Sequence, residues 1–271
     1  MRQALIFGLI GSSALVLGGA LGAYWRAPVR VTGVLLAFAS GTLLSALAFE
    51  LFPEAVELGG LMPAGLGLLA GGLTFVVVNT WLDSRVARQV GDPQGMPGVP
   101  DDVAEELSGA EAQQTERVED AAARGREAGG AVGFALLAAV TLDGVPENLA
   151  LGVSLLSGGG SMVLLVAIFA SNLPEALVGA VAMRRGGRSP LFAIAIWTGA
   201  ALLLTAAVVL GRGVFAQMPE HNLAFPLAFA GGAVLASLAD TLMPEAFERG
   251  RPLNSFATAA GFFVSFVLSG G

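Results

Sequence analysis

Two short stretches place acidic and polar side chains beside a proline within otherwise apolar sequence. They read "DGVPE", Asp143 to Glu147, and "SNLPE", Ser171 to Glu175. Residues four apart share one face of an α-helix, so Asp143 lies over Glu147 and Ser171 over Glu175. Proline donates no backbone hydrogen bond, which leaves one carbonyl in the preceding turn without its helical donor. Because oxygen atoms are the ligands of hard and borderline cations, we predict a divalent-cation site.

The acids of these stretches are costly if their segments cross a membrane. An ionised side chain at the bilayer centre costs roughly 2.5–3.5 kcal/mol on insertion scales, so Asp143, Glu147 and Glu175 together cost on the order of 8–10 kcal/mol. Protonation or a bound divalent cation would remove that cost. The structural alternative is that both prolines are tolerated kinks and the acids form interhelical hydrogen bonds. We favour the cation site, because no lysine or arginine lies in any apolar core.

Further acids lie along the same path. Glu50 and Asp240 lie deep in two other apolar segments and are additional candidate ligands on the ion's route. Glu54 and Glu245 lie one turn or so beyond them. These two residues either mark the opposite mouths of the ion's route or are simply solvated at helix ends.

The segments that must position these residues are long and apolar. The chain has 271 residues, of which 55% are hydrophobic and 13% charged, whereas a soluble domain carries roughly 25% charged residues. Each apolar block is close to the ~20 residues that a membrane-crossing helix needs. We therefore predict an all-α polytopic membrane protein with eight transmembrane helices. The blocks are 4–23, 32–51, 62–83, 131–156, 160–183, 189–211, 222–243 and 253–269.

Arginine placement predicts the orientation. Twelve of the fourteen arginines fall in the connections after the first, third, fifth and seventh blocks, and basic loops stay cytoplasmic. Both termini are then expected outside a cytoplasmic (inner) membrane. The hydrophilic stretch 84–130 is expected to be a flexible cytoplasmic loop, with acidic metal sensing as the alternative. The first block could instead be a signal peptide, but a sequence repeat assigns it a partner.

Internal repeats predict the architecture. Phe38–Gly59 recurs as Phe229–Gly250 at a fixed offset of 191 residues (229 minus 38), with the Pro-Glu-Ala core intact. The two Pro-Glu stretches repeat as well. Opposite orientations within each pair indicate inverted repeats, which are typical of secondary transporters. We predict a 3+2+3 plan, divided as 1–83, 84–130, 131–183 and 184–271.

At these residues the chain resembles the ZIP family of divalent-metal transporters, over essentially its whole length. That family has eight helices, outward termini, a long third cytoplasmic loop and paired metal-binding motifs on the fourth and fifth helices. The resemblance implies that Glu147 and Glu175 are central ligands, that Asp143 replaces a family histidine, and that Asn172 stands where a second metal's ligand is usual. Glu50 and Asp240 are weaker candidates. It also implies an elevator-like or rocking movement of the first, fourth, fifth and sixth helices, and a possible homodimer.

Departures from the family pattern bear on the metal. The fourth-helix pattern is roughly His-Asn-x-Pro-Glu-Gly, so Asp143 replaces an imidazole and Gly144 removes an amide that would help to hold a second ion. An all-oxygen site favours Mn²⁺, Fe²⁺ or Mg²⁺ over zinc, relative to a site with histidine. The expected substrate is Zn²⁺ or another divalent metal (Mn²⁺, Fe²⁺ or Cd²⁺), moved inward at one main site.

Other functions fit less well. The expectation is a transporter in a lipid bilayer, with no enzyme activity, no required cofactor and no nucleic-acid partner. One alternative is a proton-coupled carrier of another small solute. The other is an intramembrane hydrolase in which paired acids, such as Asp143 with Asp240, activate water; it leaves the repeats unexplained.

Overall fold

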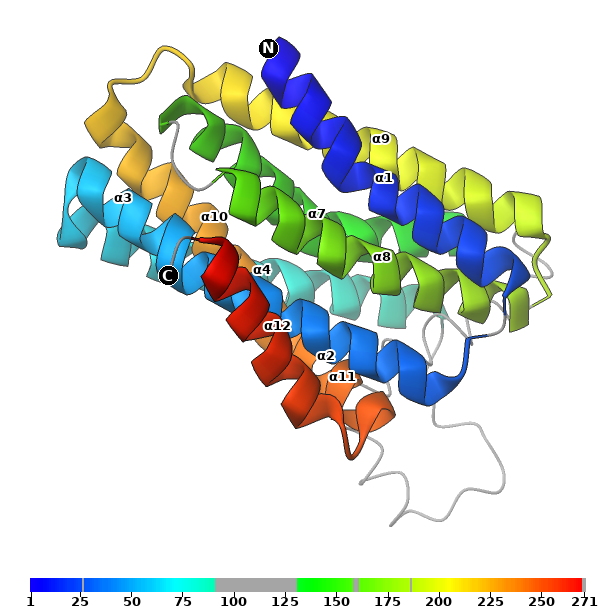
Figure 1. Ribbon diagram of the computed structural model, residues 1–271. Helices are drawn as coiled ribbons and strands as arrows, with labels where there is room; N and C mark the ends of the chain where they lie inside the picture. Colours follow the sequence, from blue (N-terminus) through cyan, green and yellow to red (C-terminus); the bar gives the residue numbers. More distant parts are fainter. Residues whose placement is uncertain (26, 91–130, 158–160, 186, 270–271) are drawn as a thin grey trace.

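The computed structural model describes the chain except residues 26, 91–130, 158–160, 186 and 270–271, and the described part is helical without strands (Figure 1). Six helical stretches in it are long and apolar enough to cross a membrane, and α12 is a shorter apolar helix. The prediction of an all-helical membrane protein is confirmed at this level. The elements are α1 (Arg2–Tyr24), α2 (Val29–Ala46), η1 (Leu47–Leu51), α3 (Phe52–Gly59), α4 (Leu61–Val90), α7 (Ala131–Ser157), α8 (Ser161–Arg185), α9 (Pro190–Phe215), η3 (Glu220–Leu223), α10 (Ala224–Ser237), η4 (Leu238–Leu242), α11 (Met243–Gly250) and α12 (Asn254–Leu268).

Three helical stretches extend two turns or nearly so beyond the predicted ends of their apolar blocks. The second runs as α2, η1 and α3 to Gly59, the seventh continues through α11 to Gly250, and α4 continues to Val90. Hydropathy underestimates these lengths because the added turns carry charged or polar residues and are amphipathic. Most of the predicted loop 84–130 lies outside the described residues, so its flexibility stays a prediction.

Two turns of π-helix interrupt the second and seventh stretches at corresponding places. They are η1 and η4, which begin 191 residues apart (238 minus 47). The residue after each turn donates its backbone N–H to the carbonyl five positions back, and the next residues are Pro53 and Pro244. A proline cannot donate to the carbonyl four positions back, so a widened turn just before it accommodates the break in the ladder.

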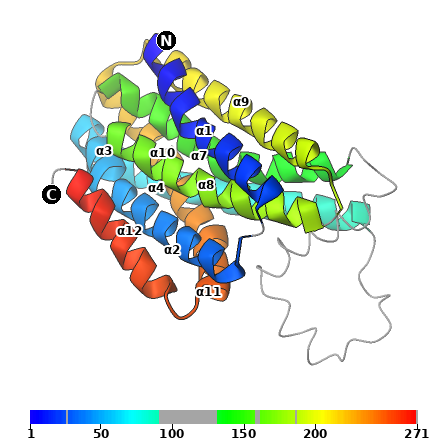
Figure 2. The same ribbon diagram turned by 45° about the vertical axis from the view of Figure 1, so that its right-hand side comes forward.

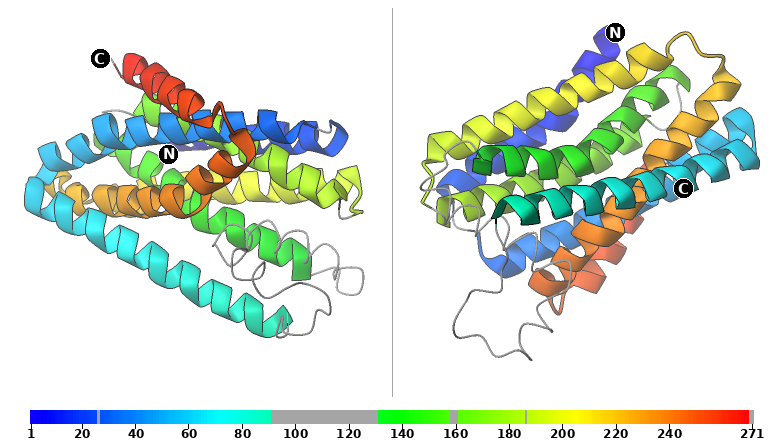
Figure 3. Two further views of the ribbon diagram at one scale, coloured as in Figure 1. Left: turned by 90° about the horizontal axis from the view of Figure 1, so that it is seen from below. Right: turned by 180° about the vertical axis from the view of Figure 1, so that it is seen from behind.

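The helices pack in two groups. We call α1, α7, α8 and α9 the α7–α8 group, because α1 packs on α8 and α9, and α7 on α9 (Figure 2). The other elements form the α2–α10 group, in which α4 packs on α10 and α2 on α12 and α11 (Figure 3). The groups meet chiefly where α2 contacts α8 and α10 contacts α7.

Glycines bring helix backbones into direct contact within each group. A Cβ on Gly71 of α4 would lie 1.8 Å from the Phe229 carbonyl oxygen of α10, and one on Gly261 of α12 would lie 2.0 Å from that of Phe38 in α2. Similar contacts join α1 to α8 and α7 to α9. Among the described glycines, each such approach to another helix's carbonyl joins elements of one group. Small residues let membrane helices approach this closely, so each group is packed as a unit.

Candidate metal centre

The two Pro-Glu stretches lie inside continuous helices. Pro146 is within α7 and Pro174 within α8. Glu147 is only 6% exposed, and Glu175 is half-buried. The helix α7 packs chiefly on α9 and α8 chiefly on α1, while α7 and α8 touch over a smaller area. The side chain of Asp143 lies outside the described residues, although its backbone is part of α7.

Two neutral polar residues of α8, just before its proline, are fully enclosed. Ser171 is 0% and Asn172 1% exposed. The Ser171 hydroxyl donates to the Ile168 carbonyl at 3.0 Å, and the Asn172 amide nitrogen donates to the Gly11 carbonyl of α1 at 3.4 Å. Both groups act as donors in these bonds, so their oxygens keep acceptor capacity. A hydroxyl and an amide oxygen on α8 can therefore add neutral ligands to the carboxylates.

The position of α7 that corresponds to Asn172 offers no such oxygen. Gly144 lies against α9, where an added Cβ would lie 2.6 Å from Leu204 Cδ1 and 3.0 Å from its Cδ2. Leu204 is 0% exposed and therefore has no room to turn away into lipid. A leucine occupies the space that an amide at position 144 would need, so α7 has no counterpart of Asn172 at this position.

One polar residue beside the site was missed by sequence reasoning. Asn148 directly follows Glu147 and is 0% exposed. Its amide nitrogen donates to the Gly144 carbonyl at 2.8 Å, which turns its Oδ1 away from that carbonyl. This oxygen has no hydrogen-bond partner among the described residues. The signal available in the sequence was an asparagine inside an apolar segment, because a buried amide normally has hydrogen-bond partners for all its polar atoms.

Glu50 and Asp240 lie in the two π-helical turns. Glu50 is half-buried in η1, and this turn contacts α8. Asp240 in η4 is exposed and accepts a hydrogen bond from Asn79 of α4 at 2.7 Å. The turn that carries Glu50 therefore contacts α8, one of the two helices with a Pro-Glu stretch. Asp240 is hydrogen-bonded to α4, a helix of its own group. Their roles as ligands remain predictions.

Glu54 and Glu245 have different partners. Glu54 of α3 accepts hydrogen bonds from Ser154 and Ser157 of α7, the first at 3.2 Å. Glu245 of α11 forms an ion pair with Arg249 of its own helix at 3.1 Å. Glu54 is consequently more than a solvated helix end.

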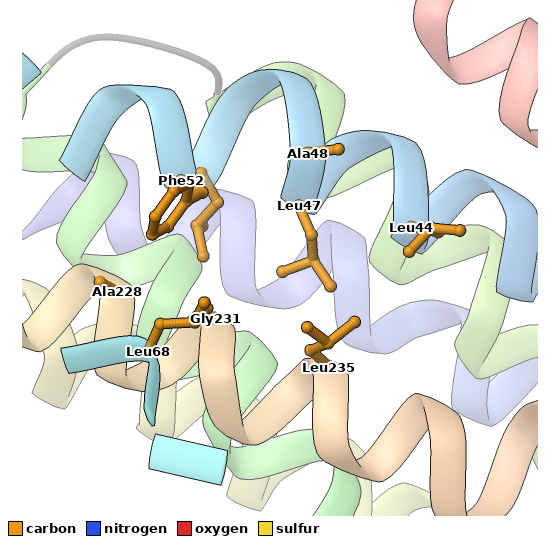
Figure 4. Close-up of a pocket in the computed structure, with 9 residues that line it drawn as sticks. Leu44, Leu47, Ala48, Phe52, Leu68, Ala228, Gly231 and Leu235 are labelled. Atoms are coloured by element: carbon orange, nitrogen blue, oxygen red, sulfur yellow. The ribbon is translucent and has the colours of Figure 1, made fainter. Parts of the chain in front are cut away.

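A pocket of about 170 Å³ beside η1 is apolar (Figure 4). Leu47, Phe52, Leu68 and Leu235 are among the residues that line it. Its lining residues offer no ligand to a cation.

The donor set fits a hard or borderline cation. The described candidates supply carboxylate, hydroxyl and amide oxygens, and the chain has no cysteine. Among the side chains that the structure describes, no three or more His, Cys, Asp or Glu residues are grouped closely enough to hold a metal ion. The side chain of Asp143 is not among these described side chains. A site here therefore combines acidic with neutral oxygens.

Comparison with known proteins identifies a family. The family model described as "ZIP Zinc transporter" matches residues 3–222, which include both helices with a Pro-Glu stretch. A comparison with curated proteins gives no significant match.

Proposed function

Because the chain belongs to the ZIP zinc transporter family, we propose that it moves a divalent metal cation inward across the cytoplasmic membrane by alternating access. The observation that carries the proposal is Glu147, a carboxylate almost fully enclosed among apolar helices. A doubly charged ion bound between Glu147 and Glu175 would offset the charge of both carboxylates.

The ligands we propose lie on α7 and α8. Glu147 and Glu175 are the central carboxylates, Asp143 adds a third from α7, and Ser171 and Asn172 supply neutral oxygens. Glu50 and Asp240 mark the route beyond the site. Leu204 fills the space that an amide side chain at position 144 of α7 would need, and this favours one main ion. Such a set suits Zn²⁺, Mn²⁺, Fe²⁺ or Cd²⁺.

The movement we propose is that of the α7–α8 group against the α2–α10 group. The dense glycine contacts within groups support rigid bodies that move as wholes. The 3+2+3 inverted repeat is supported by the paired π-helical turns, and by the way α4 packs on α10 as α12 packs on α2. The start of α1 and the end of α12 lie toward the end of the bundle that holds α3, which we propose faces outward (Figure 1).

Metal uptake into proteoliposomes tests this function. We expect the double variant Glu147→Ala, Glu175→Ala to lose at least about tenfold of the uptake rate, because charged ligands contribute more than 1.4 kcal/mol each. The exposed Glu57→Ala in α3 is the matched control and should keep the parent rate. Competition among Zn²⁺, Mn²⁺, Fe²⁺, Mg²⁺ and Cd²⁺ then identifies the substrate. Unchanged uptake by the double variant contradicts the proposal.

A further inference from the structure

A pair of hydrogen bonds joins the two helix groups at one end of the bundle. Ser154 and Ser157 of α7 donate to different oxygens of the Glu54 carboxylate, Ser154 to Oε2 at 3.2 Å and Ser157 to Oε1. Ser157 is the last residue of α7. One carboxylate from α3 therefore holds the final turn of the helix that carries Glu147.

Three other long-range side-chain bonds each stay within one group. Asn172 of α8 binds the Gly11 carbonyl of α1, and Arg212 of α9 binds the Leu155 carbonyl of α7. The bond from Asn79 to Asp240 joins α4 to η4 inside the other group. The glycine backbone contacts are also internal to the groups. The two bonds to Glu54 cross the boundary between the groups, which none of the close backbone contacts at the described glycines does.

The repeat-related carboxylate behaves differently. Glu245 corresponds to Glu54 at the offset of 191 residues, yet it pairs with Arg249, one turn further along its own helix. The residue one turn after Glu54 is Leu58, which offers no charge. Corresponding positions of inverted repeats exchange roles as a transporter alternates. A bond across the groups at Glu54, with an internal pair at Glu245, indicates that the Glu54 end is the closed one.

We infer that Glu54 is a positioning residue that holds the outer end of the interface shut through Ser154 and Ser157. The inference rests on the proposed alternating access, in which this end must open to admit the ion. Losing two hydrogen bonds between membrane helices shifts the open population by about tenfold or more. Glu54 acts through α7 and does not itself need to touch the metal.

Cysteine labelling tests the inference without metal flux. The chain has no cysteine, so Leu155→Cys provides a single probe at a residue that is 5% exposed and lies between the two serines. A membrane-impermeant maleimide is applied to the outer side of proteoliposomes. We expect the labelling rate to rise about tenfold with Glu54→Ala or with Ser154→Ala plus Ser157→Ala. Combining all three changes should raise it no further, because each breaks the same contact.

Two further variants separate positioning from general loss of structure. Glu54→Gln keeps one acceptor oxygen and should give an intermediate rate, whereas the control Glu57→Ala should match the parent. Labelling unchanged by both the Glu54 and the serine variants, or additive between them, overturns the inference. If labelling responds as expected but metal uptake is insensitive to Glu147 and Glu175, the contact stands and the proposed function fails.

Discussion

Replacing Gly71 with alanine should force α4 away from α10. The added Cβ would lie 1.8 Å from the Phe229 carbonyl oxygen and 2.7 Å from its carbon, whereas ordinary contact begins at 3.4 Å. Both atoms belong to the backbone, so no side-chain rotation relieves the overlap. The two helices must separate locally by about 1.6 Å (3.4 minus 1.8), which loosens the contacts around the crossing.

The size of the effect follows from two opposing contributions. Alanine is favoured over glycine inside a helix by about 0.8–1.0 kcal/mol. Overpacking a tight contact costs about 1–3 kcal/mol, and more where the backbone must move. Gly65 lies on the same helix, and an added Cβ there meets nothing within 4 Å. Gly65→Ala therefore shows the helix preference alone, and Gly71→Ala should be about 1–3 kcal/mol less stable than that control.

Thermal unfolding of the purified protein in detergent measures the difference. For a chain of this size each kcal/mol shifts Tm by roughly 2–4 °C, so Gly71→Ala should unfold about 2–12 °C below Gly65→Ala. Gly261→Ala should behave like Gly71→Ala, because its Cβ meets the Phe38 carbonyl oxygen at 2.0 Å. Equal Tm values for Gly71→Ala and Gly65→Ala would refute the close packing of α4 on α10.

Three other outcomes are expected. Gly144→Asn alone should lower Tm, and adding Leu204→Ala should recover part of the loss, since the leucine occupies the space for the new amide; strictly additive effects would count against this packing. Asn172→Ala should destabilise the protein by roughly 0.6–1.7 kcal/mol in the same assay, because it removes the bond to the Gly11 carbonyl of α1; an unchanged Tm would argue that this bond is not formed. Saturating metal should raise the Tm of the parent through linkage and raise that of Glu147→Gln less, so an equal rise in both would exclude Glu147 as a ligand.

Much of the fold follows from patterns in the sequence. Apolar blocks near the length of a membrane span predicted helices, because only satisfied backbones are stable in lipid. The ends of these helices were predicted less well. Charged turns such as Phe52–Gly59 interrupt the apolar run, yet they continue the helix as an amphipathic segment. Hydropathy measures apolar composition and not backbone hydrogen bonding.

The π-helical turns could not be predicted from composition. Pro53 and Pro244 were visible, but a proline in a helix can produce a kink, a break or a widened turn. Which of these forms depends on packing against neighbouring helices. The recurrence of one solution at both positions, an i to i−5 bond just before the proline, appears only in the structure.

The burial of several candidate site residues agrees with the sequence analysis, while their role as metal ligands stays a prediction and their neighbours were not predicted. Buried Glu147, Ser171 and Asn172 agree with an enclosed polar centre. The leucine that fills the space at Gly144 is distant in sequence, as are the serines that bind Glu54. Contacts between such distant residues depend on how the helices pack, and a single sequence contains no local signal for them.

Equilibrium binding of radioactive zinc or manganese to the purified protein tests the central claim most directly. We predict about one ion per chain for the parent and for the control Glu57→Gln, because the proposed site has one set of acidic and neutral oxygens. Affinity should fall by at least about tenfold in Glu147→Gln and in Glu175→Gln, since each removes a charged ligand. Binding of the same strength and stoichiometry in both of these variants would contradict a metal centre shared by α7 and α8.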